Sequence, residues 1–88
     1  MKIEDQITTI VKGKDAQALK KNPALVECMD TTMGELFARW CATGPKDAEE
    51  RMAIWSTAQA LKEFKDTIDA FINNGKYEEL NSDQNNDK

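Results

Sequence analysis

Histidine is absent from this sequence of 88 residues, and cysteine, proline and glycine are scarce. Without histidine, the chain has neither the commonest general base of enzymes nor the commonest ligand of transition metals. The two cysteines, Cys28 and Cys41, lie thirteen positions apart, which on one helix separates them by about 20 Å and excludes a disulfide between them. We therefore expect two reduced thiols.

Long apolar runs and an excess of basic residues are also missing. No segment approaches the roughly 18 apolar residues that a membrane-spanning helix needs. The first residues, MKIEDQ, lack the apolar stretch of a secretory signal. The net charge of -4 disfavours tight nonspecific binding to a nucleic-acid backbone. These features predict a cytoplasmic protein with no membrane partner, and they make nucleic acid a disfavoured partner.

The basic residues that are present gather near the start of the chain. Residues 1–22 contain five lysines and three acidic residues, although the chain as a whole is acidic. A basic arm of this kind offers cations to phosphate, but no aromatic platform accompanies it, so a solvated arm is the favoured interpretation. The candidates for phosphate contact are Lys12, Lys14, Lys20 and Lys21.

The positions of proline and glycine predict an all-α fold. Asn22-Pro23 is typical of an N-cap followed by the first residue of a helix. Gly44-Pro45 indicates a left-handed cap and the start of the next helix, and Asn74-Gly75 indicates a helix end. Because the corner is short, we predict an antiparallel helical hairpin of residues 23–43 and 45–74.

The segments on either side of the hairpin have weaker patterns. Residues 1–21 predict a short N-terminal helical arm in which Gly13 acts as a stop, although ITTIV at residues 7–11 also suits a strand. Residues 77–88 have too few apolar groups to offset the entropy of ordering, so we predict a disordered polar tail. The chain is then one small domain at 1–76, with its hairpin at 22–76.

Helical spacing separates the only two tryptophans of the chain. Trp40 shares one apolar stripe, the predicted core face, with residues at intervals of three and four. Trp55 instead falls among charged positions of the next helix, beside a second apolar spot. The stripe of Trp40 consists of Leu25, Met29, Thr32, Met33 and Leu36.

Two groups of residues are predicted to need cover. The first surrounds Trp55, and the second lies where the long helix extends past the end of its partner helix. Either the N-terminal arm or another protein chain supplies that cover, and helical spacing leaves both alternatives open. The predicted partner-binding residues are Met52, Trp55, Gln59, Ile68, Phe71 and Ile72.

No arrangement of residues predicts chemistry. The adjacent carboxylates Glu49-Glu50 and Glu78-Glu79 point about 100° apart on a helix and are poorly placed to share a substrate or an ion. Glycine-rich phosphate loops and nucleophile motifs are missing from the sequence. We therefore predict no catalytic residue, no cofactor site and no metal site, and we expect a protein that is not an enzyme.

The layout of Asn22-Pro23, Trp40, the segment from Arg51 to Trp55, Ala60-Leu61 and Gly75-Lys76 resembles small helical proteins of unknown function encoded by tailed bacteriophages. The resemblance implies an accessory role in virion assembly or in binding a host factor, in the cytoplasm of a bacterial host. We therefore predict a non-enzymatic protein-interaction module, with self-association as one of its forms. The alternative is a small nucleic-acid-associated regulator that uses the lysine-rich arm.

Overall fold

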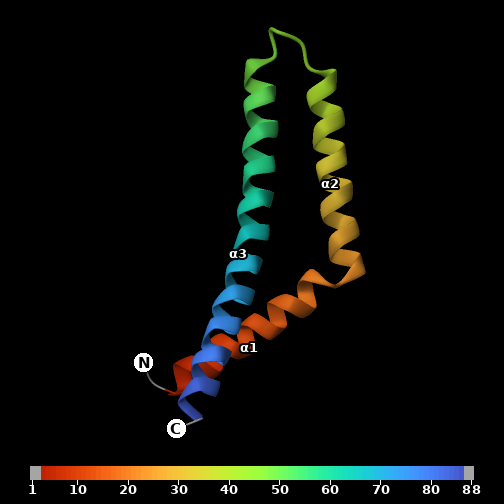
Figure 1. Cartoon of the computed structure of the whole chain (residues 1–88). Coiled ribbons are helices and arrows are strands. Elements are labelled where there is room, and N and C mark those ends of the chain that lie inside the picture. Colours follow the sequence, from red (N-terminus) through yellow and green to blue (C-terminus); the bar gives the residue numbers. More distant parts are fainter. Residues whose placement is uncertain (1–2, 87–88) are drawn as a thin grey trace.

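The computed structural model describes residues 3–86 of the chain, and the side-chain environments of residues 3–82, as an assembly of three helices and no strand. These are α1 (Ile3–Lys20), α2 (Pro23–Ala42) and α3 (Ala48–Asn86). Figure 1 shows α2 and α3 next to each other and running in opposite directions. Helix α1 joins the start of α2 at one end, and its other end crosses α3 near the C-terminal end of α3 (Figure 1). The predicted all-α class is confirmed.

Helix α1 is longer and more regular than predicted, because Gly13 does not end it. Its β-branched segment is helical, and the hydroxyl groups of Thr8 and Thr9 donate to the carbonyl oxygens of Glu4 and Asp5, at 2.9 and 2.8 Å. Such bonds to the preceding turn satisfy threonine hydroxyls within a helix. The helical alternative for this segment is therefore correct.

Gly13 and Gly75 mark the point where α1 and α3 cross. A Cβ atom built on Gly13 would lie 2.8 Å from the Phe71 carbonyl oxygen and 2.9 Å from the Gly75 Cα. One built on Gly75 would lie 3.0 Å from the Gly13 Cα. The two backbones thus approach each other at a distance that only glycine allows. The prediction that these glycines end their helices is wrong. Both helices continue through them, and the missing side chains allow the two backbones to pack closely.

The α1–α3 contact contains the main apolar core of the molecule. Ala16 of α1 is buried against Ile68 and Ile72 of α3, and Leu25 packs against this cluster from the start of α2. The Lys20 Nζ atom adds an ion pair at 2.7 Å to the Asp69 Oδ1 atom. The N-terminal arm of the same chain therefore covers the part of α3 that extends past α2.

Helix α3 continues from Gly75 through Asn86, so the predicted disordered tail is wrong for residues 77–86. The reason is tertiary for the first turn beyond Gly75, where Glu78 is buried and the Lys14 Nζ atom of α1 lies 3.7 Å from the Glu79 Oε1 atom. Packing of this kind supports a helix that composition alone would not stabilise. The last part of the predicted tail, residues 87–88, lies outside the described residues.

The two ends of α2 and the start of α3 agree with the predictions from the sequence in part. Asn22 caps α2 as predicted, with its Oδ1 atom accepting from the backbone N–H groups of Ala24 and Leu25 at 2.9 and 3.3 Å. At the other end, no described glycine has a positive φ angle, so the predicted left-handed cap at Gly44 is wrong. Helix α3 begins at Ala48 instead of Pro45. The residue before it, Asp47, accepts a hydrogen bond from the Gly44 N–H at its Oδ2 atom, at 2.8 Å.

Candidate interaction surface

Three adjoining sections of a groove lie along α2 and α3 between the corner and the junction with α1. The section near the junction is lined by the apolar residues Leu25, Val26, Met29, Met33 and Ile68, and also by the charged residues Lys20, Asp30, Lys65 and Asp69. Met33 also borders the next section, and Trp40 and Trp55 border both that section and the section nearest the corner. We use the name aromatic surface for the exposed residues of the corner half, which are Met33, Phe37, Trp40, Met52 and Trp55.

The large side chains of the aromatic surface are open to solvent. Phe37 is 69% exposed, Met52 62% and Trp55 55%. Beneath them, Leu36 and Ile54 are buried and line the same groove. The two helices thus bury a narrow line of side chains between them and leave the aromatic residues on one flank of that line.

Trp40 lies on this flank as well, so its predicted place in the core is corrected. It is 37% exposed and shares its grooves with Trp55. At about 100° per helical residue, Trp40 lies roughly 40° away from Leu36, which is the residue that points toward α3. A pair of helices has no third element to close over a side chain at that angle. The two tryptophans therefore belong to one surface.

Arg51 holds the indole of Trp40 at the edge of this surface. The guanidinium carbon lies 4.9 Å from the centroid of the Trp40 ring, within the range of a cation–π contact. The same guanidinium donates from Nε to the Thr43 Oγ1 atom at 2.7 Å and from a terminal nitrogen to the Thr43 carbonyl oxygen at 3.4 Å. These bonds fix the orientation of Arg51, and through it the position of the Trp40 ring.

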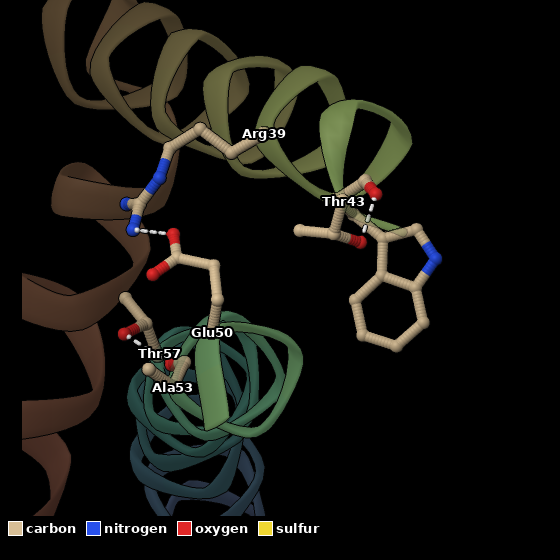
Figure 2. Close-up of polar contacts among 6 residues, drawn as sticks. Arg39, Thr43, Glu50, Ala53 and Thr57 are labelled. Carbon is tan, nitrogen blue, oxygen red and sulfur yellow. Dashed lines mark hydrogen bonds and ion pairs between the residues drawn. The ribbon is translucent and has the colours of Figure 1, made fainter. Parts of the chain in front are cut away.

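Polar side chains near the corner bond to each other or to their own helix. Figure 2 shows Arg39 of α2 donating to Glu50 of α3, with 3.0 Å between the Nη2 and Oε1 atoms. The Thr43 hydroxyl donates to the Trp40 carbonyl oxygen at 2.6 Å, and the Thr57 hydroxyl donates to the Ala53 carbonyl oxygen at 3.0 Å (Figure 2). The exposed large apolar residues nearest the corner lie in the aromatic surface, whereas Phe64 and Phe71 are exposed farther along α3.

The residues predicted around Trp55 divide as follows. Met52 and Trp55 belong to the aromatic surface, whereas Gln59 is half-buried and lines none of its grooves. The grooves at the corner are lined by α2 and α3 alone, and α1 lies at the other end of the molecule (Figure 1). The N-terminal arm of the same chain therefore does not cover Trp55, which was one of the two predicted alternatives.

The second predicted group has a different environment. Ile68 and Ile72 are buried by α1 and Leu25, so in this arrangement they offer nothing to a partner. Phe71, between them in sequence, remains exposed. The arm folds back on this group because Gly13 and Gly75 let the two helices approach closely.

Helical spacing alone missed three residues of the aromatic surface: Met33, Phe37 and Trp40. Met33 and Trp40 were assigned to the core, and Phe37 was assigned to no stripe. A signal was present, because Val26, Met33, Phe37 and Trp40 recur at intervals of seven, four and three and form a stripe of their own. Whether this stripe is buried or exposed depends on which face of α2 packs against α3.

The four lysines proposed for phosphate contact do not form one patch. Lys14 and Lys20 are paired with Glu79 and Asp69. Lys12 and Lys14 lie two positions apart on α1, which places them about 200° apart around the helix. The arm therefore presents its charge in several directions, and acidic residues of α3 offset part of it.

The described residues offer little support for metal or covalent chemistry. No three metal-binding side chains cluster within the described part of the chain, and Cys28 and Cys41 are free and exposed. Glu78 is the one buried carboxylate there, and its Oε2 atom has no hydrogen-bond partner among the described residues. It lies one turn beyond Gly75, next to Glu79, which pairs with Lys14 of α1.

Comparisons place the chain beside no known protein. No family model, no curated protein and no solved structure matches it. Within the described residues, no helix has a stretch long and apolar enough to cross a membrane. The aromatic surface is the feature of the described residues best suited to binding.

Proposed function

We propose that the chain is a non-enzymatic protein-interaction module that binds through the aromatic surface. The observation that carries the proposal is the exposure of Phe37, Trp40 and Trp55 side by side on one flank of the α2–α3 pair. Tryptophan, phenylalanine, methionine and arginine are enriched at the centres of protein interfaces, and charged residues other than arginine are depleted there. The aromatic surface, with Arg51 at its edge, has this composition.

The size of the surface also supports the proposal. An aromatic side chain offers about 150–250 Å² of area, so the exposed fractions of the three rings correspond to roughly 300 Å². Met33 and Met52 add to this. A contiguous apolar patch of about 300–600 Å² is the size of the largest patch on a typical monomer, and such a patch is often functional. The accessory role in virion assembly or host-factor binding that the phage resemblance implies is compatible with such a surface, and we include it in the proposal.

The nucleic-acid alternative receives less support. Phosphate contact needs several cations on one side of a molecule. The ion pairs of Lys14 and Lys20 with α3 reduce the charge that the arm offers, and the helical geometry of α1 disperses what remains. We therefore retain protein binding as the proposed function.

Site-specific photo-cross-linking in bacterial cells tests the proposal. A benzophenone amino acid is placed at Phe37, within the aromatic surface, or at Phe64 as a matched control. Phe64 is also an aromatic residue of the hairpin, is 47% exposed and lines none of the grooves. We expect discrete protein adducts from position 37 and none of the same mass from position 64, because only the first position would lie inside an interface.

The adducts at position 37 can contain a second copy of this chain or a different protein, and both results support the proposed function. Equal adducts from both positions, or none from position 37, would contradict it.

A further inference from the structure

We propose that the occupant of the aromatic surface is a second copy of this chain, placed so that two α2–α3 pairs face each other as the two layers of a four-helix bundle. This inference rests on the proposed function and adds the identity of the partner. It is carried by the exposed area of the chain and by the thinness of the α2–α3 core, and the charge of the surface is compatible with it.

The exposed area is larger than that of a compact monomer of this mass. The accessible area is 6941 Å², whereas a compact monomer of 9.9 kDa exposes about 5,200 Å². The radius of gyration is 18.8 Å, against about 12 Å for a compact domain of this length. The excess of roughly 1,700 Å² per chain amounts to roughly 3,400 Å² for two chains, which is within the range of 2,000–5,000 Å² or more for obligate homodimers.

The α2–α3 pair lacks a second layer. A stable helical domain packs its elements around a core between layers. In the corner half of the molecule, Leu36 and Ile54 are the buried apolar residues that the structure describes, and α1 crosses α3 at the opposite end (Figure 1). A second pair laid over the aromatic surface would enclose Phe37, Trp40 and Trp55 between two layers. This completes the core of a four-helix bundle.

The charge of the surface is compatible with a copy of the same chain. Each chain carries a net charge of -4, so two copies repel each other wherever their acidic sides meet. The five residues of the aromatic surface are uncharged, and the neighbouring Arg51 is positive and stacked on Trp40. A two-fold symmetric interface brings the same patch together from both subunits. An uncharged aromatic patch can face itself without placing like charges in contact.

Sedimentation equilibrium of the purified full-length chain, from about 1 to 200 μM, tests the inference together with tryptophan fluorescence. Both tryptophans belong to the aromatic surface, so their emission reports on this interface. We expect twice the 9.9 kDa chain mass at high concentration, and a red shift of the emission as dilution separates the copies. Phe37→Glu and Trp55→Glu should each weaken dimerisation by at least about 30-fold, as loss of a central aromatic anchor does. Phe64→Glu should not weaken it.

The photo-cross-linking positions keep the test decisive if a charged variant fails to fold. In the purified protein, a benzophenone at position 37 should join two copies, and one at position 64 should not. A chain that remains monomeric over the whole concentration range overturns the inference, as does a dimer joined through position 64 and not through position 37. If the purified chain is monomeric while position 37 captures a different protein in cells, the inference fails and the proposed function stands. If position 37 captures neither, both fail.

Discussion

Gly13 and Gly75 show how two residues without side chains position the N-terminal helix. A methyl group on Gly75 would meet the Gly13 Cα at 3.0 Å and the Thr9 carbonyl oxygen at 3.3 Å, and both are backbone atoms that cannot move without displacing a helix. Gly34 provides a contrast within α2, because nothing lies within 4 Å of a Cβ built there. Glycine is therefore required for close packing at position 75, whereas at position 34 a larger residue has room.

Alanine substitution distinguishes the two roles. We expect Gly75→Ala to lower the free energy of unfolding by about 1–3 kcal/mol, as overpacking does. Gly34→Ala should raise it by about 0.5–1 kcal/mol, since alanine is the better helix former and has room at that site. Urea unfolding followed by circular dichroism measures both. A stabilising Gly75→Ala would show that α1 and α3 do not cross at this point.

At the scale of whole elements, the C-terminal part of α3 and helix α1 support each other. The turns beyond Gly75 include the buried Glu78 and the partner of Lys14, so they are part of the surface on which α1 packs. Composition predicted a disordered tail for this segment. Its helical state instead depends on a contact with residues more than sixty positions earlier in the chain.

Two truncations test this dependence. A chain that ends at Asn74 lacks the crossing glycine of α3, and we expect amide hydrogen exchange in the segment 10–16 of α1 to become at least about tenfold faster, because the helix loses its docking site. A chain that ends at Ser82 keeps the crossing and should show the exchange rates of the full-length protein. If both truncated chains matched the full-length protein, the segment from Gly75 onward would have no role in holding α1.

At the scale of the molecule, the principal extents of 65 × 25 × 16 Å describe an elongated protein with little interior. The buried apolar residues that the structure describes are Ala16, Leu36, Ile54, Ile68 and Ile72. A core of this size gives a small chain little stability, and association is a common remedy. Stability should therefore be coupled to assembly.

This coupling makes the melting temperature depend on protein concentration. For a chain that folds as a dimer, raising the concentration favours the folded state by mass action. We expect the melting temperature of the wild-type chain and of the Phe64→Glu variant to rise by several degrees between about 5 and 200 μM. The Phe37→Glu variant should melt at one temperature throughout, or be unfolded at both concentrations. Differential scanning calorimetry checks this, and a wild-type melting temperature independent of concentration would separate folding from association.

The sequence by itself determined the features that depend on neighbouring residues. The all-helical class was predicted from the positions of proline and glycine together with apolar spacing at three and four positions. The start of α2 follows from the capping chemistry of Asn22 and the fixed backbone of Pro23. The exposure of Trp55 and Met52 also followed from the helical period of their own segment. Such features are set within one or two turns of helix, so local sequence is sufficient for them.

The tertiary structure alone decided what the same residues contact. Gly13 and Gly75 are residues of a type common at helix ends, yet they are the crossing point of two helices, because the two backbones pack together where only glycine leaves room. Trp40 has the period of a core residue, yet it lies on the surface with Trp55, because two helices bury only the line between them. The fate of an apolar side chain depends on which distant element covers it, and helical periodicity carries no information about that element.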